Sequence, residues 1–172
     1  SSTASAEKIY EMLTTGDASL IPQMITNEYG NMVVQSLLRT VSQSKRLEFF
    51  KKYLSTSSSS SANNKLVEYS QHPFASRVIF FLVEEKNSKL LDAATHQAIF
   101  VALKPHILDL AQHINGRYII EQLVVPHREV KEILATNFLH LAGAKGSQPV
   151  LVKLYESSDA AVRARLANLV SA

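Results

Sequence analysis

The 172-residue chain is predicted to be an all-α solenoid, a stack of about four helical repeats that forms part of a longer array. Three observations predict this fold. Apolar residues recur at helical spacing, only five glycines and five prolines interrupt them, and four segments of the chain resemble one another. Repeats of this size bury their apolar faces only against stacked neighbours, which is what makes a solenoid.

The spacing of apolar residues predicts an amphipathic helix in each part of the chain. Val33, Val34, Leu37, Leu38 and Val41 recur at i, i+1, i+4, i+5 and i+8, which places them on one helix face. The same kind of pattern recurs in residues 9–13, 47–54, 78–83, 119–124 and 159–170. At 46% hydrophobic residues, the chain has enough apolar side chains to cover these faces with a core.

Four segments share a short apolar helix, a polar turn, a small residue and a second apolar helix. The small residues that align are Gly30, Ala75, Gly116 and Gly146. We expect them where two helices of a repeat approach closely. The fourth copy is predicted to be degenerate, because Pro149 follows the small residue and is expected to interrupt the second helix.

This alignment divides the chain into repeats and one insertion. Residues 1–17 are predicted to be the N-terminal helix of a preceding or capping repeat. The Ser-rich segment 55–64 is predicted to be a flexible loop, because Ser and Asn compete with helix formation. The repeats are then 18–54, 65–104 and 105–135, with a degenerate fourth repeat and C-terminal helix in 136–172.

Composition excludes several classes of function. The absence of cysteine excludes disulfides, thiolate metal sites and cysteine nucleophiles. The six histidines are not spaced as metal ligands, and no nucleotide-binding or nucleophile motif occurs, so we expect no metal, cofactor, small-molecule substrate or enzymatic activity. No apolar run reaches the roughly 18 residues that a membrane span needs. The net charge of +3 permits a phosphate-binding face without requiring one.

The segment Asn27-Glu28-Tyr29-Gly30-Asn31-Met32-Val33-Val34-Gln35 resembles the core of the pumilio (PUF) repeat. Residues 72–79 and 116–121 are similar to further versions, and the resemblance covers about residues 18 to 156. It implies an RNA-binding solenoid in which three side chains of each second helix face the RNA. Two of them, at i and i+4, read a base edge, and the one between them stacks on bases. Amide side chains suit edge reading because they both donate and accept hydrogen bonds.

Carried over to the first two repeats, the resemblance predicts five RNA-binding residues. The first repeat offers Asn31 and Gln35 as edge readers and Met32 at the stacking position. The second offers Ser76 and Arg77, with Phe80 where an amide is expected. Arg77 can stack through its guanidinium plane. Packing within the protein is the alternative for Met32 and Phe80.

The last two repeats offer five more candidates. The third has Arg117, Tyr118 and Glu121, and Arg117 and Glu121 are spaced to form an ion pair with each other. The fourth has Ser147 and Gln148. Only the first repeat keeps a complete amide pair, so the resemblance implies weak base specificity.

Two further sets of residues have open interpretations. His72 and His113 precede the second helix at equivalent positions, where we expect a role in the turn, with phosphate contact as the alternative. Lys45, Arg46, Lys51 and Lys52 lie on the predicted third helix of the first repeat. They form either a solvated helix face or a phosphate-binding surface.

The resemblance implies a non-enzymatic RNA-binding protein. It is similar to divergent nucleolar pumilio-like proteins that bind precursor ribosomal RNA, which predicts a nuclear and nucleolar location and ribosome-assembly proteins as partners. A cytoplasmic location is the alternative. Two other functions stay open: a sequence-specific regulator that binds mRNA 3′ untranslated regions, and a HEAT- or armadillo-like scaffold that binds a protein partner.

Overall fold

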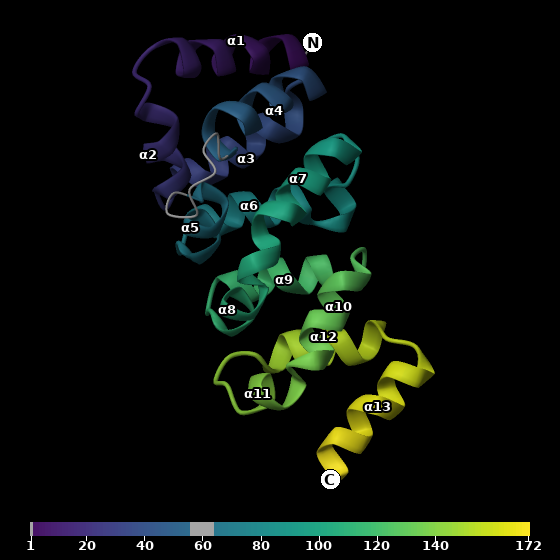
Figure 1. Ribbon diagram of the computed structural model, residues 1–172. Coiled ribbons are helices and arrows are strands. Elements are labelled where there is room, and N and C mark those ends of the chain that lie inside the picture. Colours follow the sequence, from purple (N-terminus) through teal and green to yellow (C-terminus); the bar gives the residue numbers. More distant parts are fainter. Residues whose placement is uncertain (1, 56–63) are drawn as a thin grey trace.

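The computed structural model describes residues 2–55 and 64–172, which form helices stacked into an elongated array (Figure 1). No strand occurs in this described part of the chain, so the predicted all-α fold class is confirmed. Residues 56–63 of the predicted Ser-rich loop lie outside it. The helices are α1 (Ser2–Thr15), α2 (Leu20–Thr26), α3 (Gly30–Thr40), α4 (Gln43–Phe49), α5 (Lys65–Gln71), α6 (Ala75–Val83), α7 (Ala93–Leu103), α8 (Ile107–Gln112), α9 (Gly116–Val124), α10 (Arg128–Thr136), α11 (Phe138–Ala142), α12 (Gln148–Ser157) and α13 (Ala160–Ser171). A π-helical segment, Phe50–Leu54, continues α4, and two 3₁₀ turns, Glu85–Asn87 and Lys104–His106, join longer helices.

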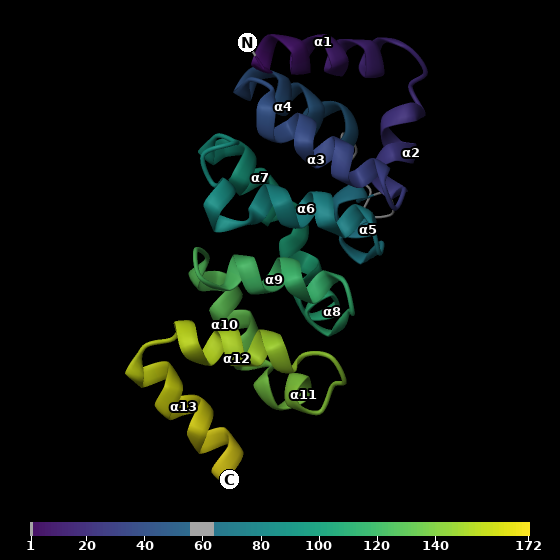
Figure 2. The same cartoon turned by 180° about the vertical axis from the view of Figure 1, so that it is seen from behind.

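The helices after α1 group into units of three. The first helices (α2, α5, α8 and α11) lie along one side of the array (Figures 1 and 2). The second helices (α3, α6, α9 and α12) lie in the middle, and each packs against its own first helix and against a neighbouring second helix. The second helices therefore form one continuous layer, which is the layer that carries the predicted RNA-binding residues.

The turn before three of the second helices is held by a side chain at an equivalent position. Asn27 Oδ1, His72 Nδ1 and His113 Nδ1 each accept hydrogen bonds from the backbone N–H groups two and three residues later, at 2.9 to 3.3 Å. These contacts satisfy N–H groups at the helix start that have no partner within the helix. The turn role predicted for His72 and His113 is confirmed, and it occupies the Nδ1 atom of both rings.

Two glycines let a first and a second helix approach closely. A Cβ atom added to Gly30 would lie 2.6 Å from the carbonyl oxygen of Met24, and one added to Gly116 would lie 3.0 Å from that of Leu110. The first distance is shorter than real Cβ contacts, and the second is tighter than most of them. In the second unit, Ala75 fills this position and is fully buried, so the helix pair there leaves room for a methyl group.

The fourth unit differs by one residue from the predicted alignment. Ala144 N–H donates to the Leu141 carbonyl across the turn, as Asn27 N–H does to the Met24 carbonyl. Counting from these bonds places Ser147, rather than Gly146, at the position of Gly30. Ser147 is fully buried, and its hydroxyl donates to the carbonyl oxygens of Leu141 and Ala144.

Two expectations for the fourth unit are corrected by this register. Gly146 lies in the preceding turn with φ 97°, a left-handed conformation that favours glycine. Pro149 lies in the first turn of α12 and does not interrupt it, since the N–H that proline lacks has no helical partner there.

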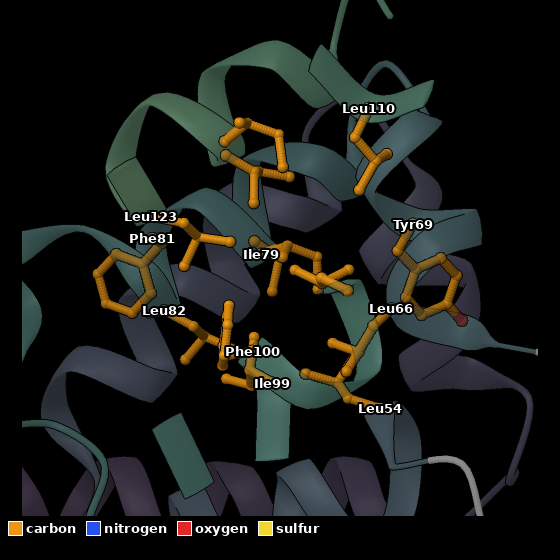
Figure 3. Close-up of a cluster of buried hydrophobic side chains, with 14 of the residues drawn as sticks. Leu54, Leu66, Tyr69, Ile79, Phe81, Leu82, Ile99, Phe100, Leu110 and Leu123 are labelled. Atoms are coloured by element: carbon orange, nitrogen blue, oxygen red, sulfur yellow. The ribbon is translucent and has the colours of Figure 1, made fainter. Parts of the chain in front are cut away.

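The hydrophobic core runs as one cluster through all the units. In the close-up of Figure 3, Leu54 at the end of the first unit lies beside Leu66 at the start of the second. Ile79 and Leu82 of α6 lie near Phe100 of α7 in the same cluster. Each unit thus covers the apolar face of its neighbour, as the solenoid prediction requires.

Candidate nucleic-acid interface

A groove with a volume of about 460 Å³ runs across α3, α6 and α9. Six of the ten residues predicted to bind RNA line it, because they occupy matching positions on successive second helices. The lining residues are Asn31, Met32, Gln35, Ser76, Arg77, Phe80, Asn115 and Tyr118. The other four predicted residues, Arg117, Glu121, Ser147 and Gln148, lie outside this groove.

Three side chains stand at the predicted stacking position of the three helices. Met32 is 61% exposed, Tyr118 is 48% exposed, and Arg77 is also exposed. The Arg77 guanidinium carbon lies 5.8 Å from the ring centroid of Phe74, the residue that precedes α6. Thioether, guanidinium and phenol groups all present flat or polarisable surfaces on which a base can stack.

The amide of Asn31 is used within the protein. Asn31 is fully buried, and its Nδ2 donates to the carbonyl oxygens of Asn27 and Glu28 at 2.8 and 2.7 Å. Its Oδ1 accepts a hydrogen bond of 3.1 Å from Gln35 Nε2. Both Asn31 donors are therefore occupied, and the partly exposed Gln35 is the member of the pair that keeps a free acceptor for a base.

The second unit offers little hydrogen bonding to a base. Ser76 is only 7% exposed, and Phe80 has no polar group where the resemblance expects an amide. Phe80 packs partly against the core while it lines the groove. This part of the groove therefore suits the faces of bases better than their edges.

Arg117 contacts Tyr118 and the turn before α12 within the protein. Its Nη1 donates to the Gly146 carbonyl oxygen at 3.3 Å, and its Nη2 donates to Tyr118 Oη at 3.1 Å. Its guanidinium carbon also lies 4.9 Å from the Tyr118 ring centroid. These contacts connect the aromatic ring in the groove to the turn before α12.

The predicted ion pair between Arg117 and Glu121 is not formed. Glu121 Oε1 and Arg117 Nε are both buried, and neither has a hydrogen-bond partner among the described residues. Burial raises the pKa of Glu121, while the charges of Arg117 and Lys153 act in the opposite direction. The terminal nitrogens of Arg117 instead donate to Gly146 and Tyr118.

Asn115 is a groove residue that the sequence did not indicate. It directly precedes α9, and its Nδ2 donates to the carbonyl oxygen of Gln71 at 2.9 Å. That bond joins the third unit to the first helix of the second unit. The only signal in the sequence is its amide side chain, with two donors and one acceptor, and such side chains occur at many exposed positions.

The basic residues of the first unit mainly stabilise its third helix. Lys45 forms ion pairs with one carboxylate of α1 and one of α4, at 3.4 and 3.3 Å. Arg46 donates to three backbone carbonyl oxygens, and Lys52 donates to one at 3.0 Å. These contacts hold the helix against its neighbours. They give Lys45, Arg46 and Lys52 a structural role that needs no phosphate ligand.

Two general features of the described residues bear on function. Within residues 2–55 and 64–172, no three His, Asp or Glu side chains are grouped so as to hold a metal ion. In the same part of the chain, none of the helices combines the length and hydropathy needed to cross a bilayer.

The stacked three-helix units, with a groove across the second helices, define an α-solenoid whose fold matches that of solved Puf RNA-binding domains. The solved Puf4 RNA-binding domain bound to the HO endonuclease RNA 3′ UTR recognition sequence matches with a TM-score of 0.73 and 19% identity. That match covers 96% of this chain and 48% of the Puf4 chain.

Two other solved structures give the same result. The Puf3 RNA-binding domain bound to site A of the Cox17 RNA 3′ UTR recognition sequence matches with a TM-score of 0.76 and 18% identity, over 95% of this chain and 46% of its own. PUF-8 in complex with PBE-RNA matches with a TM-score of 0.72 and 17% identity, over 92% and 44%. The chain thus spans about half the length of these structures. Sequence comparison finds no matching family model and no matching curated protein.

Proposed function

We propose that this chain is a pumilio-type protein that binds single-stranded RNA in the groove across α3, α6 and α9, without catalysing a reaction. The observation that carries the proposal is the alignment of Met32, Arg77 and Tyr118, which stand at one position on three successive helices and line one groove. Stacking surfaces repeated at a regular interval suit a polymer of bases. The RNA-bound state of the Puf structures with the same fold supports this choice of ligand.

Base specificity in this groove is proposed to be weak. Base faces stack on Met32, Arg77 and Tyr118, and Arg77 also attracts phosphate. Of the edge-reading positions, Gln35 alone keeps a free amide acceptor, since Asn31 is hydrogen-bonded to its own turn and Phe80 is apolar. One base position is therefore read by a hydrogen bond, and the others accept any base.

Binding of fluorescent oligonucleotides to the 172-residue chain tests the proposal. Affinity should fall as salt rises, because phosphate contacts release counterions. Tyr118→Ala should weaken binding by about 5- to 150-fold, which corresponds to the roughly 1–3 kcal/mol of one base stack. Tyr155→Ala is the matched control, because Tyr155 is a half-exposed tyrosine of α12 outside the groove. Binding that ignores salt, or that falls equally in both variants, would contradict the proposal.

Base substitution in the oligonucleotide tests specificity. With weak reading, a change of base should alter affinity at one position, and Gln35→Ala should remove that preference. A regulator that recognises one defined sequence would instead lose affinity at several positions. That outcome would favour binding to mRNA 3′ untranslated regions, as in the Puf structures with this fold.

The RNA that we propose is precursor ribosomal RNA, with a nucleolar location and ribosome-assembly proteins as partners. The weak edge reading supports this choice, because an RNA held within a large particle does not need to be selected base by base. Crosslinking of the full-length protein to cellular RNA, with the sites mapped, tests it. Crosslinks concentrated in mRNA 3′ untranslated regions would overturn it.

A further inference from the structure

A second hollow, which we call the His127 pocket, lies beside the groove and has a volume of about 280 Å³. The groove is lined by Phe80 of α6 and Tyr118 of α9, and the pocket by Val83 and Glu121 of the same helices. Residues three apart on a helix lie on one face about one turn from each other. The two hollows are therefore neighbours along both helices.

One wall of the pocket is an aromatic platform. The His127 ring stacks on the Phe100 ring, with centroids 4.1 Å apart and an interplanar angle of 7°. Phe100 is 3% exposed and belongs to the core, so it supports one face of the imidazole from beneath. Burial lowers the pKa of His127, which favours the neutral ring. A neutral ring fixed in this way can carry a further flat ring on its other face.

The remaining walls offer both polar and apolar contacts. Gln122 brings an amide that donates and accepts, and Lys153 brings an ammonium group. The polar walls also include the carboxylates of Glu85 and Glu121. Val125 and Pro126 supply apolar surface. The volume lies just below the usual range for ligand pockets, so it suits a single small ring system rather than a larger ligand.

We propose that the His127 pocket binds one unpaired nucleobase of the RNA strand that occupies the groove, stacked on His127. The inference rests on the proposed function. The platform holds the base face, Gln122 meets its edge, and Lys153 neutralises an adjoining phosphate. A strand that passes over Tyr118 reaches this pocket by turning one helical step along α9.

Oligouridylates and oligoadenylates of increasing length, from about 3 to about 10 nucleotides, test the inference. At one base per unit, the shortest of them fill only the groove, and the longer ones also reach the pocket. His127→Ala should leave the affinity of the shortest oligonucleotides unchanged. It should weaken the longer ones by about 5- to 150-fold, as expected for one lost base stack. His127→Phe keeps a flat ring and should bind like the wild type. His140→Ala, at an exposed position of α11, is the matched control.

A second variant and a direct readout keep the test independent of folding. Gln122→Ala should reduce affinity for the longer oligonucleotides only, and thermal unfolding of each variant checks its fold. A photoreactive uridine placed at successive positions should crosslink within residues 122–127 from one position. The pocket inference fails if Tyr118→Ala weakens binding but His127→Ala has no effect, or weakens binding equally at every oligonucleotide length. The proposal that RNA binds in the groove would survive either result. If neither variant affects binding, the proposed function fails as well.

Discussion

The close approach of α2 and α3 at Gly30 can be tested by adding a single methyl group. In Gly30→Ala the new Cβ would lie 2.6 Å from the carbonyl oxygen and 2.8 Å from the Cα of Met24. Both are backbone atoms, so no side-chain rotation relieves the contact and α2 must move away. Overpacking of this kind costs roughly 1–3 kcal/mol. Alanine regains up to about 1 kcal/mol of helix propensity over glycine. We expect a net loss of about 1–2 kcal/mol in the free energy of unfolding.

Urea unfolding followed by circular dichroism measures this loss. For a chain of this size, 1–2 kcal/mol should also lower the melting temperature by roughly 2 to 8 °C. Gly16→Ala is the matched control, because its Cβ would meet nothing nearer than the Met12 carbonyl oxygen, at 3.7 Å. If Gly30→Ala were as stable as Gly16→Ala, the close approach would not constrain the sequence, and the reasoning would be wrong.

Three other predictions concern the groove, the residues that support it and the His127 pocket. Because Arg117 acts through Tyr118, the losses of RNA affinity caused by Arg117→Met and Tyr118→Phe should be non-additive by about 0.5–1.5 kcal/mol in a double-mutant cycle. Additive losses would show that the two side chains act separately. Asn31→Ala removes the side-chain hydrogen bond to the Glu28 carbonyl oxygen, whereas the Asn27 carbonyl oxygen keeps the backbone N–H of residue 31 as a donor. Urea unfolding should therefore show a loss of about 1–3 kcal/mol, and an unchanged stability would refute that role. The lowered pKa of His127 means that the unfolded chain takes up this proton first as pH falls. Stability should therefore decline as pH falls below the ordinary histidine pKa of 6.5, and the decline should be smaller in His127→Phe; equal pH profiles would contradict this account.

Local periodicity predicted much of the fold. The apolar spacing from Val33 to Val41 corresponds to a helix with one buried face, and small residues at 30, 75 and 116 begin three second helices. These features depend on neighbours a few residues away, which the sequence displays directly. The fourth unit was placed one residue too early, because Gly146 and Ser147 are both small. Only the turn hydrogen bonds and the left-handed φ of Gly146 distinguish their positions.

The candidate site was predictable in position but less so in the role of each residue. The spacing of Met32, Arg77 and Tyr118 within their repeats brought them into one groove. The role of Arg117 depends on Gly146, which lies 29 residues further along the chain. A helical spacing rule favours Glu121 as its partner, because such a rule contains no information on the next unit. Hydrogen-bond partners from a neighbouring unit can be identified only once the stacking of the units is known.

The hydrogen bonds between units fix the spacing and orientation of the units along the solenoid. Asn115 fixes the third unit to Gln71 of the second, and Arg117 fixes it to Gly146 of the fourth. Since each unit contacts mainly its neighbours, a small rotation at one junction displaces every unit beyond it by an amount that grows with distance. In the proposed RNA complex, a shift in such a junction would put distant stacking residues out of step with the nucleotides before any stacking residue had changed. Selection on the proposed RNA recognition can therefore act on residues such as Arg117 that lie outside the groove.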